Sequence, residues 1–352
     1  SLESRDDGAD LFIALDDHPF IISSIAETLS DAEIKVEAFF HPIVVHENKP
    51  VAVSFININE RSLETAKSLL PKLREILRNL TRVGKDFNSM KSLMLTASQA
   101  LLLEPIQTNS GEFTSNEVSQ FLTWLNDGCF FFLGGGTGST SNGLNRSSLL
   151  GVWHAESSYT SRLVTEVEED VEALKHENLQ LSIRKLRLSS TVHRHATLIH
   201  ILVQPNKTSA TFYSFVGYLT SKAWAHESQD IPILRRKVEA ITAQEGTIPN
   251  SHDYKYLVEV IDNMPTDEAL ATPTSNLINL ANVALEVFSQ EETRTLTSID
   301  EIGRRAFTTI VLPPERYSAT AQAAIQELLE ATFKAEPGSS DAFIDSSKKR
   351  QF

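Results

Sequence analysis

Three apolar runs of strand length, followed by two amphipathic helical patterns, constrain this chain more than any other part of its sequence. The runs are rich in Val, Ile, Phe and Tyr and are separated by polar breaks; they are residues 186–192, 197–203 and 211–219. Apolar residues fall on both faces of the last run, which predicts a strand covered on both sides. Helical stripes follow over 231–241 and 256–264. The stretch predicts a sheet with two helices to cover it.

Composition and charge restrict the class of protein. A length of 352 residues predicts two or three domains, and 41% hydrophobic with 22% charged residues is ordinary for a soluble globular protein. The single cysteine, Cys129, excludes an internal disulfide and suits a reducing cytoplasm. No apolar run approaches the roughly 20 residues that span a bilayer. The formal charge of −14 argues against nucleic-acid binding. We expect a cytoplasmic protein that binds neither nucleic acid nor membrane.

The N-terminal third predicts elements in the order strand, helix, strand, strand, helix. This order builds an open sheet with helices on one face. The first helix has an apolar stripe of Ile21, Ile22, Ile25 and Leu29. The predicted elements are strands at 11–15, 34–40 and 51–58 and helices at 21–29 and 63–80.

Further along, Thr114 with Glu117 three residues later fits a capping box at a helix start. Residues 294–299 and 306–312 predict a hairpin. The other predicted elements are a linker at 104–111, strands at 129–133 and 149–154, and helices at 93–103, 162–178, 277–288 and 321–333.

Residues 134–143 are dominated by Gly, Ser, Thr and Asn and follow an apolar strand. This context is compatible with a phosphate-binding loop. However, the run lacks the Gly-Lys-Ser/Thr ending of a P-loop and the last glycine of a dinucleotide fingerprint, and no helical pattern begins at its end. We therefore favour a flexible loop over a nucleotide site.

His193, His195 and His200 lie close together in the sequence. On a strand, His193 and His195 share one face and His200 points to the other. Without a nearby cysteine or a suitably placed carboxylate they make a poor metal site, so we predict no metal and favour a structural role. His193 and Arg194 would then contact backbone carbonyls or a neighbouring carboxylate.

Arg235 and Arg236, followed by Lys237, form a basic run within a helical pattern. They are candidates for contacts with an anion or with another module. We favour the interpretation in which Leu234 and Val238 face the core and the basic side chains lie on the solvated side, with an interdomain salt bridge as the alternative.

The sequence contains no set of residues that would assemble an active site. None of its Ser and Thr residues lies in a Gly-x-Ser-x-Gly turn, and no dinucleotide fingerprint is followed by an acidic residue about 20 positions on. We therefore predict no catalytic residues in this chain.

Four strings occur in order along the central stretch: STVHR at 190–194, FVGYLTSKAW at 215–224, IPILRRKV at 231–238 and SHDYKYL at 251–257. Together they closely resemble the N-terminal region of the large NAD-specific glutamate dehydrogenases of bacteria. Those enzymes are several times longer than this chain. The resemblance therefore implies a front portion without the catalytic domain, so that NAD belongs to the parent enzyme and this portion has no cofactor.

The first strand-to-helix turn, D-D-H-P-F, resembles the corresponding turn of the ACT domain, a small module that binds amino acids there. Asp16, Asp17, His18 and Phe20 are therefore the ligand-binding candidates. A helix N-terminus suits an amino-acid carboxylate, and the two Asp side chains suit its ammonium group. Phe20 occupies the place where ACT domains usually have glycine.

We expect an α/β protein of the α+β sandwich type, made of consecutive ACT-like βαββα modules with mainly antiparallel sheets covered by helices. The expected divisions are a first module at 1–110, a larger second module with a helical extension at 111–290, and the start of a third at 291–352 whose remaining sheet would lie beyond Phe352. By the resemblance, the parent enzyme oxidises L-glutamate with NAD. This region would regulate it by sensing an amino acid and would contact the rest of the parent chain in a homo-oligomer. The alternative is an assembly scaffold without a small ligand.

Overall fold

The computed structural model describes residues 1–5, 8–59, 62–103, 113–155, 157–177, 180–190, 192, 196–205, 210–244, 246–290, 293–299, 305–312 and 316–335. The chain forms two compact units, each assembled from two separate segments. The first unit comprises Ser1–Glu104 and Phe130–Tyr218, and the second comprises Pro105–Cys129 and Leu219–Phe352. The division at 1–110, 111–290 and 291–352 remains a prediction, and the predicted linker at 104–111 lies outside the described residues.

The first unit begins with a five-stranded antiparallel sheet of order β1-β2-β5-β3, in which β4 also pairs with β5. Because β5 lies between β2 and β3 and is antiparallel to both, β2, α1 and β3 form a split βαβ unit. The antiparallel sheet predicted from the sequence is confirmed. The elements are β1 (Leu2–Arg5), β2 (Gly8–Asp16), α1 (Ile21–Asp31), β3 (Val36–Phe40), β4 (Ile43–His46) and β5 (Lys49–Asn59).

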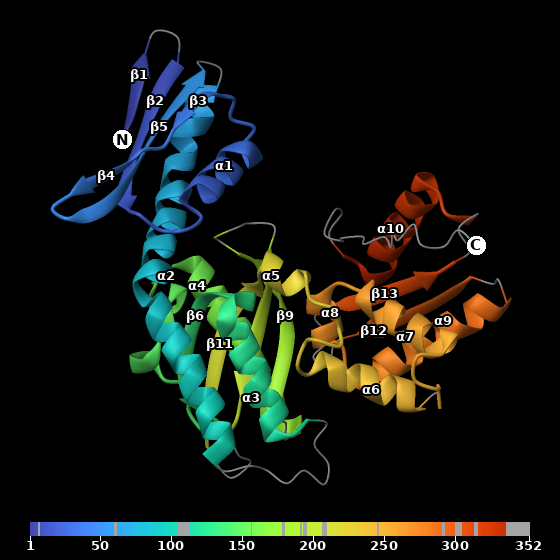
Figure 1. Cartoon of the computed structure of the whole chain (residues 1–352). Helices are drawn as coiled ribbons and strands as arrows, with labels where there is room; N and C mark the ends of the chain where they lie inside the picture. Colours follow the sequence, from blue (N-terminus) through green and yellow to red (C-terminus); the bar gives the residue numbers. More distant parts are fainter. Residues whose placement is uncertain are drawn as a thin grey trace. The chain divides into compact units, whose positions relative to one another are not determined.

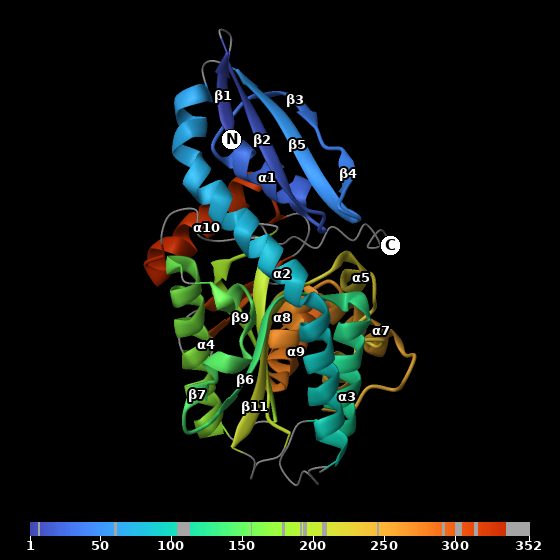
Figure 2. The same cartoon turned by 90° about the vertical axis from the view of Figure 1, so that its left-hand side faces the viewer.

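One face of this first sheet is buried and the other is open (Figure 2). Along β5, buried residues alternate with half-buried ones, as expected for a strand covered on one side. Helix α1 buries Ile21, Ile25 and Leu29. Ile22 is 50% exposed, so its assignment to the buried stripe was wrong. It follows Ile21 by one position, which turns it about 100° around the helix.

The helical patterns at 63–80 and 93–103 belong to one helix of 41 residues, α2 (Leu63–Leu103). Buried residues continue at helical spacing through its middle, where Leu80, Val83 and Met90 are almost inaccessible. Its first part packs on α1 and β2, and its later part packs on β6 (Phe130–Ser139) and β8 (Leu150–Gly151) of the second sheet. Figures 1 and 2 show the helix running from one sheet to the other. This single element therefore connects both sheets of the first unit.

The second sheet has the order β7-β6-β11-β10-β9, and β8 pairs with β6. Helix α4 packs on β9 and β10. The strands predicted at 197–203 and 211–219 are confirmed to the residue. The elements are β6 (Phe130–Ser139), β7 (Gly143–Leu144), β8 (Leu150–Gly151), α4 (Ser158–Glu177), β9 (Leu181–Ser189), β10 (Thr197–Val203) and β11 (Thr211–Leu219).

The glycine-rich run is part of strand β6, so the prediction of a flexible loop was wrong for residues 134–139. Gly134, Gly135 and Gly136 are buried. A Cβ atom on Gly134 would lie 3.2 Å from the Trp153 ring. One on Gly138 would lie 2.3 Å from the Phe212 ring. Aromatic rings pack directly on the strand backbone here, and only glycine leaves room for them.

The strand predicted at 149–154 is much shorter than expected. Only β8 is extended, and Gly151 has a φ of +66°, which turns the chain into a 3-10 helix, Val152–His154. A glycine with positive φ ends the strand and positions Trp153 beside Gly134.

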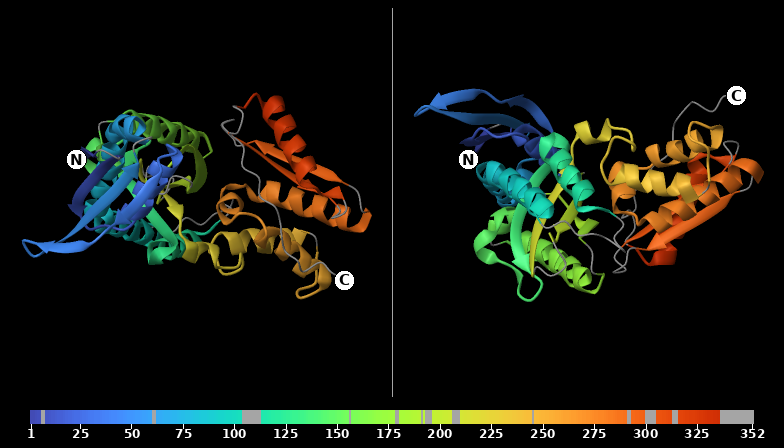
Figure 3. Two further views of the ribbon diagram at one scale, coloured as in Figure 1. Left: turned by 90° about the horizontal axis from the view of Figure 1, so that it is seen from above. Right: turned by 60° about the horizontal axis from the view of Figure 1, so that its bottom comes forward.

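In the part of the second unit that the structure describes, helices surround one β-hairpin. The predicted hairpin is confirmed with Arg294 opposite Val311, and it lies between α9 and α10 (Figure 3). No described helix has the length and hydropathy needed to cross a membrane. The elements are α3 (Ser115–Trp124), a π-type turn (Leu125–Cys129), α5 (Ser221–Trp224), α6 (Leu234–Gln244), α7 (His252–Asp262), α8 (Thr266–Ala271), α9 (Thr274–Gln290), β12 (Arg294–Ile299), β13 (Ala306–Val311) and α10 (Ala319–Phe333).

Candidate functional site

The turn between β2 and α1 contains the predicted ligand-binding residues, and Phe20 is its most unusual member. Phe20 is the N-cap residue of α1 and adopts the left-handed conformation, with φ 69° and ψ 10°. This conformation costs a residue with a side chain about 1–2 kcal/mol. The backbone geometry that usually requires glycine is therefore present here with a phenylalanine, and tertiary contacts must offset its cost.

Those contacts are aromatic and come from the second sheet. The Phe20 ring meets Phe131 of β6 edge-on, with centroids 4.6 Å apart and planes at 82°. It also lies 6.5 Å from the ring of Tyr218 on β11. Phe131 and Tyr218 stack on each other at 5.2 Å, and Phe87 of α2 joins Phe131 at 6.0 Å. Edge-to-face pairs at such distances are favourable beyond their buried area. The turn is thus attached to the second sheet.

Tyr218 is influenced by α1 as well as by the turn. Burial raises the pKa of its hydroxyl well above the usual range, and the negative charge of Glu27 on α1 raises it further. The Tyr218 hydroxyl therefore remains protonated at neutral pH, and α1 approaches β11 closely enough for Glu27 to affect it.

His18 lies against the middle of α2. A Cβ atom on Gly84 would be 2.4 Å from its Nδ1 atom, so the imidazole occupies the space that any other residue at position 84 would need. The Nε2 atom of His18 is buried and has no hydrogen-bond partner among the described residues. Glycine within a helix is unfavourable, and contact with His18 accounts for it at this position.

The N-terminus of α1 has features that suit an anion. It has no side-chain cap and no acidic residue in its first turn. The first N–H groups of any helix lack intrahelical acceptors, and the helix dipole favours negative charge there. Asp16 is exposed and Asp17 is half-buried, while the Asp17 backbone N–H donates to the Pro50 carbonyl at 3.1 Å. Donors for a carboxylate and carboxylates for an ammonium group therefore occur within one turn.

Arg235 and Arg236 contact an anion of their own chain, Glu117. The Glu117 side chain is 2% exposed and accepts from Arg235 Nε at 2.8 Å and Nη2 at 2.9 Å, and from Arg236 Nε at 3.4 Å. Its Oε1 also accepts from the Ile233 backbone N–H at 3.0 Å. Arg235 further donates to the side chain of Gln120. This cluster joins α3 to the start of α6.

The protonation of Glu117 reflects two opposing effects. Burial alone would raise its pKa, but the hydrogen bonds from Arg235 and Ile233 and the charges of both arginines hold the pKa below the usual 4.5. Glu117 is therefore ionised at neutral pH. The predicted capping box is confirmed in one direction only, since the Glu117 N–H donates to Thr114 Oγ1 at 3.2 Å. The Glu117 carboxylate is directed to the arginines.

Lys237 differs from the solvated position predicted for the basic run. It is 4% exposed, and its ammonium group donates to the carbonyls of Ala269, Leu270 and Thr272 at 2.6–3.1 Å. The ammonium group satisfies carbonyls at the C-terminal end of α8, where a positive charge is favourable. The prediction was wrong for Lys237 because tertiary carbonyl acceptors compensate the burial of its charge.

His200 forms a buried polar chain beneath α4. Its Nδ1 lies 2.5 Å from Asp170 Oδ2 and its Nε2 lies 2.8 Å from Ser214 Oγ. A Ser–His–Asp order resembles a hydrolase triad in geometry, but Ser214 and Asp170 are 0% exposed and His200 is 1% exposed. A substrate cannot reach Ser214, so the chain joins α4 to β10 and β11.

His193, Arg194 and His195 lie outside the described residues, so their predicted roles remain predictions. Within the described ranges, no group of three or more His, Cys, Asp or Glu side chains is placed to hold a metal ion.

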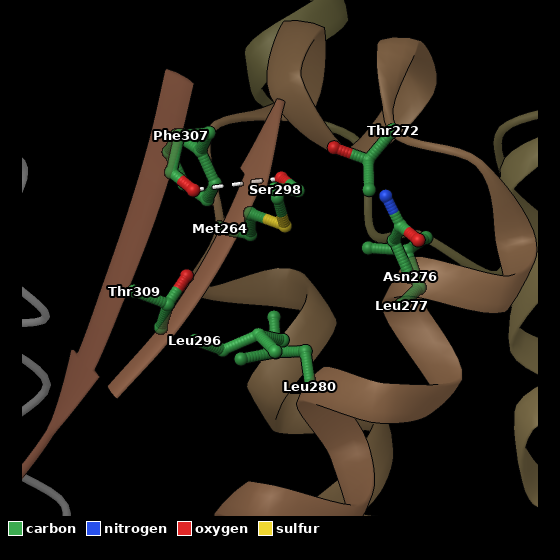
Figure 4. Close-up of a pocket in the computed structure, with 9 residues that line it drawn as sticks. All are labelled: Met264, Thr272, Asn276, Leu277, Leu280, Leu296, Ser298, Phe307 and Thr309. Atoms are coloured by element: carbon green, nitrogen blue, oxygen red, sulfur yellow. Dashed lines mark hydrogen bonds between the residues drawn. The ribbon is translucent and has the colours of Figure 1, made fainter. Parts of the chain in front are cut away.

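Two cavities among the described residues are small or open. Between α9 and the β12–β13 hairpin, a cavity of about 10 Å³ has room for about one water molecule (Figure 4). It is lined mainly by Met264, Leu277, Leu280, Leu296 and Phe307. An open depression of about 440 Å³ beside the β6–β7 turn includes the exposed side chains of Asn142, Asn145 and Arg146. Neither encloses a small molecule as ligand pockets do.

Residues 231–292 match the family model described as glutamate dehydrogenase, helical motif 1. These residues include α6 to α9 of the second unit. The relatives of this chain include NAD-specific glutamate dehydrogenases, which supports the resemblance inferred from the four sequence strings. The match does not extend to the ACT-like assignment.

Three such relatives come from different bacteria. That of Pseudomonas aeruginosa is 24% identical over 75% of this chain and 17% of its own length. That of Halomonas elongata is 23% identical over 92% of this chain and 22% of its own length. That of Mycobacterium tuberculosis is 23% identical over 78% of this chain and 16% of its own length. The chain thus spans about a fifth of the length of these relatives.

Several residues that contact the β2–α1 turn were not predicted from the sequence. Gly84, Phe131 and Tyr218 lie far from the turn along the chain, and no local pattern connects them with it. The one available signal was Phe20 itself, an aromatic residue where the ACT-like turn usually has glycine.

Proposed function

We propose that this chain is a non-catalytic regulatory and assembly region of a cytoplasmic NAD-dependent glutamate dehydrogenase. In this proposal the parent enzyme converts L-glutamate, NAD and water to 2-oxoglutarate, ammonium and NADH. NAD is the cofactor of the parent enzyme, and the chain assembles with the rest of the parent polypeptide in a homo-oligomer. The supporting observation is the length of the aligned regions. Relatives named as NAD-specific glutamate dehydrogenases align with most of this chain, but the aligned region is only about a fifth of their own length.

The regulatory part of the proposal is that the turn of residues 16–20 senses an amino acid. Its support is the uncapped N-terminus of α1 beside Asp16 and Asp17. The turn belongs to a βαββα unit with ferredoxin-like strand order, the arrangement on which the ACT-like assignment is based. An amino acid that binds one arrangement of the region more tightly than another would shift the population toward that arrangement.

A second candidate function is assembly without any small ligand. Phe20 favours it, because its ring packs on Phe131 where a ligand-binding turn would use glycine to admit a ligand to the backbone. In this function the turn serves only to fix α1 on the second sheet.

Calorimetric titration of the purified chain with the twenty amino acids, and separately with NAD, tests these functions. Saturable heat from an amino acid supports the sensor, and its loss in Asp17→Asn would assign it to the turn. Asp253→Asn, at an exposed position of α7, is the matched control. Heat from neither class of ligand supports the scaffold.

Saturable binding of NAD would contradict the non-catalytic assignment. Glutamate-dependent formation of NADH by the purified chain, followed at the absorbance of NADH, would contradict it more directly.

A further inference from the structure

Two contacts join the beginning of α1 to the rest of the first unit. The Phe20 ring packs on Phe131 and Tyr218 of the second sheet. His18 lies on the backbone of α2 at Gly84. The two sheets are therefore connected by the β2–α1 turn as well as by the continuous helix α2.

Phe20 is the residue of this pair whose backbone conformation is unfavourable in itself. Its left-handed backbone is unfavourable for a residue with a side chain, so it is maintained by the aromatic contacts of the ring. If the ring leaves Phe131, the backbone can relax to negative φ, and relaxation in turn removes the ring from the second sheet. Backbone conformation and ring position are therefore linked, which is the property of a bistable element.

We propose that Phe20 is a conformational switch that couples the β2–α1 turn to strands β6 and β11. In the engaged state the ring contacts Phe131 and the start of α1 is fixed to the second sheet. In the released state the turn relaxes and the end of β6 near Phe131 loses a packing partner. Anything that alters the turn, including a ligand at the N-terminus of α1, then alters the stability of the second sheet. The inference does not require that such a ligand exists.

The contacts of Phe131 explain how release of the Phe20 ring would affect strands β6 and β11. Phe131 is 9% exposed, stacks on Tyr218 and lies 6.0 Å from Phe87 of α2. Phe87 also lies 6.2 Å from the ring of Phe132, the next residue of β6, and Phe132 packs edge-on to Phe215 of β11 at 6.2 Å. A change at Phe131 therefore reaches both strands through contiguous aromatic contacts, in the way that packed networks transmit coupling.

Hydrogen exchange of the full chain, read by mass spectrometry, tests the switch. Phe20→Gly removes the ring and has no conformational penalty at positive φ, so the turn keeps its geometry without the contact. We expect amides of residues 130–139 and 211–218 to exchange about two- to tenfold faster, the range expected for loss of one aromatic pair. Ile22→Ala is the matched control, because Ile22 is half exposed in the same turn of α1. It should change exchange only within α1.

A second perturbation reaches the turn from α2. Gly84→Ala places a Cβ atom where His18 lies, two residues from Phe20, and should also accelerate exchange in residues 130–139. Combining Phe20→Gly with Phe131→Leu should add less than twofold to the faster single variant, because both remove the same contact.

The proposal is overturned if Phe20→Gly changes exchange only in residues 17–24. It is equally overturned if the effects of Phe20→Gly and Phe131→Leu multiply as independent changes. If Phe20→Gly lowers the helical circular dichroism, the same comparison is made with Phe20→Leu, which retains an apolar side chain.

Discussion

Glu117 is nearly inaccessible to water and yet ionised, so its charge must be compensated by the groups around it. Arg235 provides two hydrogen bonds in the fork geometry that suits a carboxylate, and the Ile233 backbone N–H provides a third. A buried ion pair adds little relative to an apolar pair, because both charges lose hydration. Removing one partner is nevertheless costly, since the other charge remains buried.

This asymmetry gives a prediction for Glu117. We expect Glu117→Ala to lower the free energy of unfolding by about 3–5 kcal/mol, because Arg235 and the Ile233 N–H lose their acceptor. Glu117→Gln retains an acceptor oxygen and should cost about 1–3 kcal/mol. Glu239→Ala removes the exposed carboxylate beside Arg236 and should change stability by less than about 0.5 kcal/mol. Urea unfolding measures all three. Equal effects of Glu117→Ala and Glu239→Ala would contradict the importance of burial.

The lowered pKa of Glu117 also predicts a dependence of stability on pH. The folded chain holds this carboxylate ionised at pH values where the unfolded chain, with a pKa near 4.5, already binds a proton. The stabilisation is therefore complete above about pH 4.5 and is lost as pH falls through the lower pKa of the folded state. Urea midpoints measured from about pH 7 down to about pH 3 should fall less steeply in Glu117→Gln than in the wild-type chain. Parallel curves would show that other carboxylates account for acid unfolding.

At this scale the sequence predicts local chemistry but not tertiary partners. Thr114 was identified as an N-cap from its spacing to Glu117, and its side chain indeed accepts from the Glu117 N–H. The carboxylate of Glu117 instead meets Arg235, 118 residues further along the chain. No periodicity connects positions so far apart, so the anion bound by Arg235 was visible only in the structure.

At the scale of elements, two of the three apolar runs of the central stretch predicted their strands, whereas the run at 186–192 overlaps only the end of β9, which covers Leu181–Ser189. Strands β10 and β11 have the predicted bounds because both are apolar runs with clear polar ends. Strand β6 was predicted only as far as its apolar half, because glycine normally indicates turns. Its glycines are in a strand because Trp153 and Phe212, both distant in sequence, pack on its backbone. Composition alone cannot separate a glycine that provides flexibility from one that provides space.

Two substitutions in β6 test whether its glycines are required because they leave space for neighbouring side chains. In Gly138→Ala the new Cβ would lie 2.3 Å from the Phe212 ring and 2.4 Å from the Gly143 carbonyl oxygen. We expect a loss of about 1–3 kcal/mol or more from overpacking. In Gly135→Ala the nearest atom is 3.4 Å away, which is an ordinary contact, and the cost should be below about 1 kcal/mol.

Differential scanning calorimetry measures this comparison, since each 1 kcal/mol shifts Tm by roughly 2–4 °C in a unit of this size. Similar shifts for Gly138→Ala and Gly135→Ala would mean that the backbone of β6 adapts freely and that glycine is not required for packing.

At the scale of the whole molecule, neither unit is a continuous segment of chain. Residues 105–129 belong to the second unit, although they stand between two parts of the first. The Glu117 cluster shows one reason, because the carboxylate on α3 is bound by the beginning of α6. The buried carboxylate of Glu117 thus ties α3 to the second unit, because its partners follow more than 100 residues later in the sequence.

The contacts between α3 and α6 predict which residues are destabilised when Glu117 is replaced. In Glu117→Ala, hydrogen exchange should rise in α3 and in residues 231–244, because they share the lost contacts. It should remain unchanged in residues 130–139, although these follow the π-type turn directly. Peptide-level exchange with Glu239→Ala as control makes the comparison. The exchange rate could instead rise only near Glu117 in the sequence and stay unchanged in residues 231–244. That result would show that α3 is held by its neighbours in sequence rather than by α6.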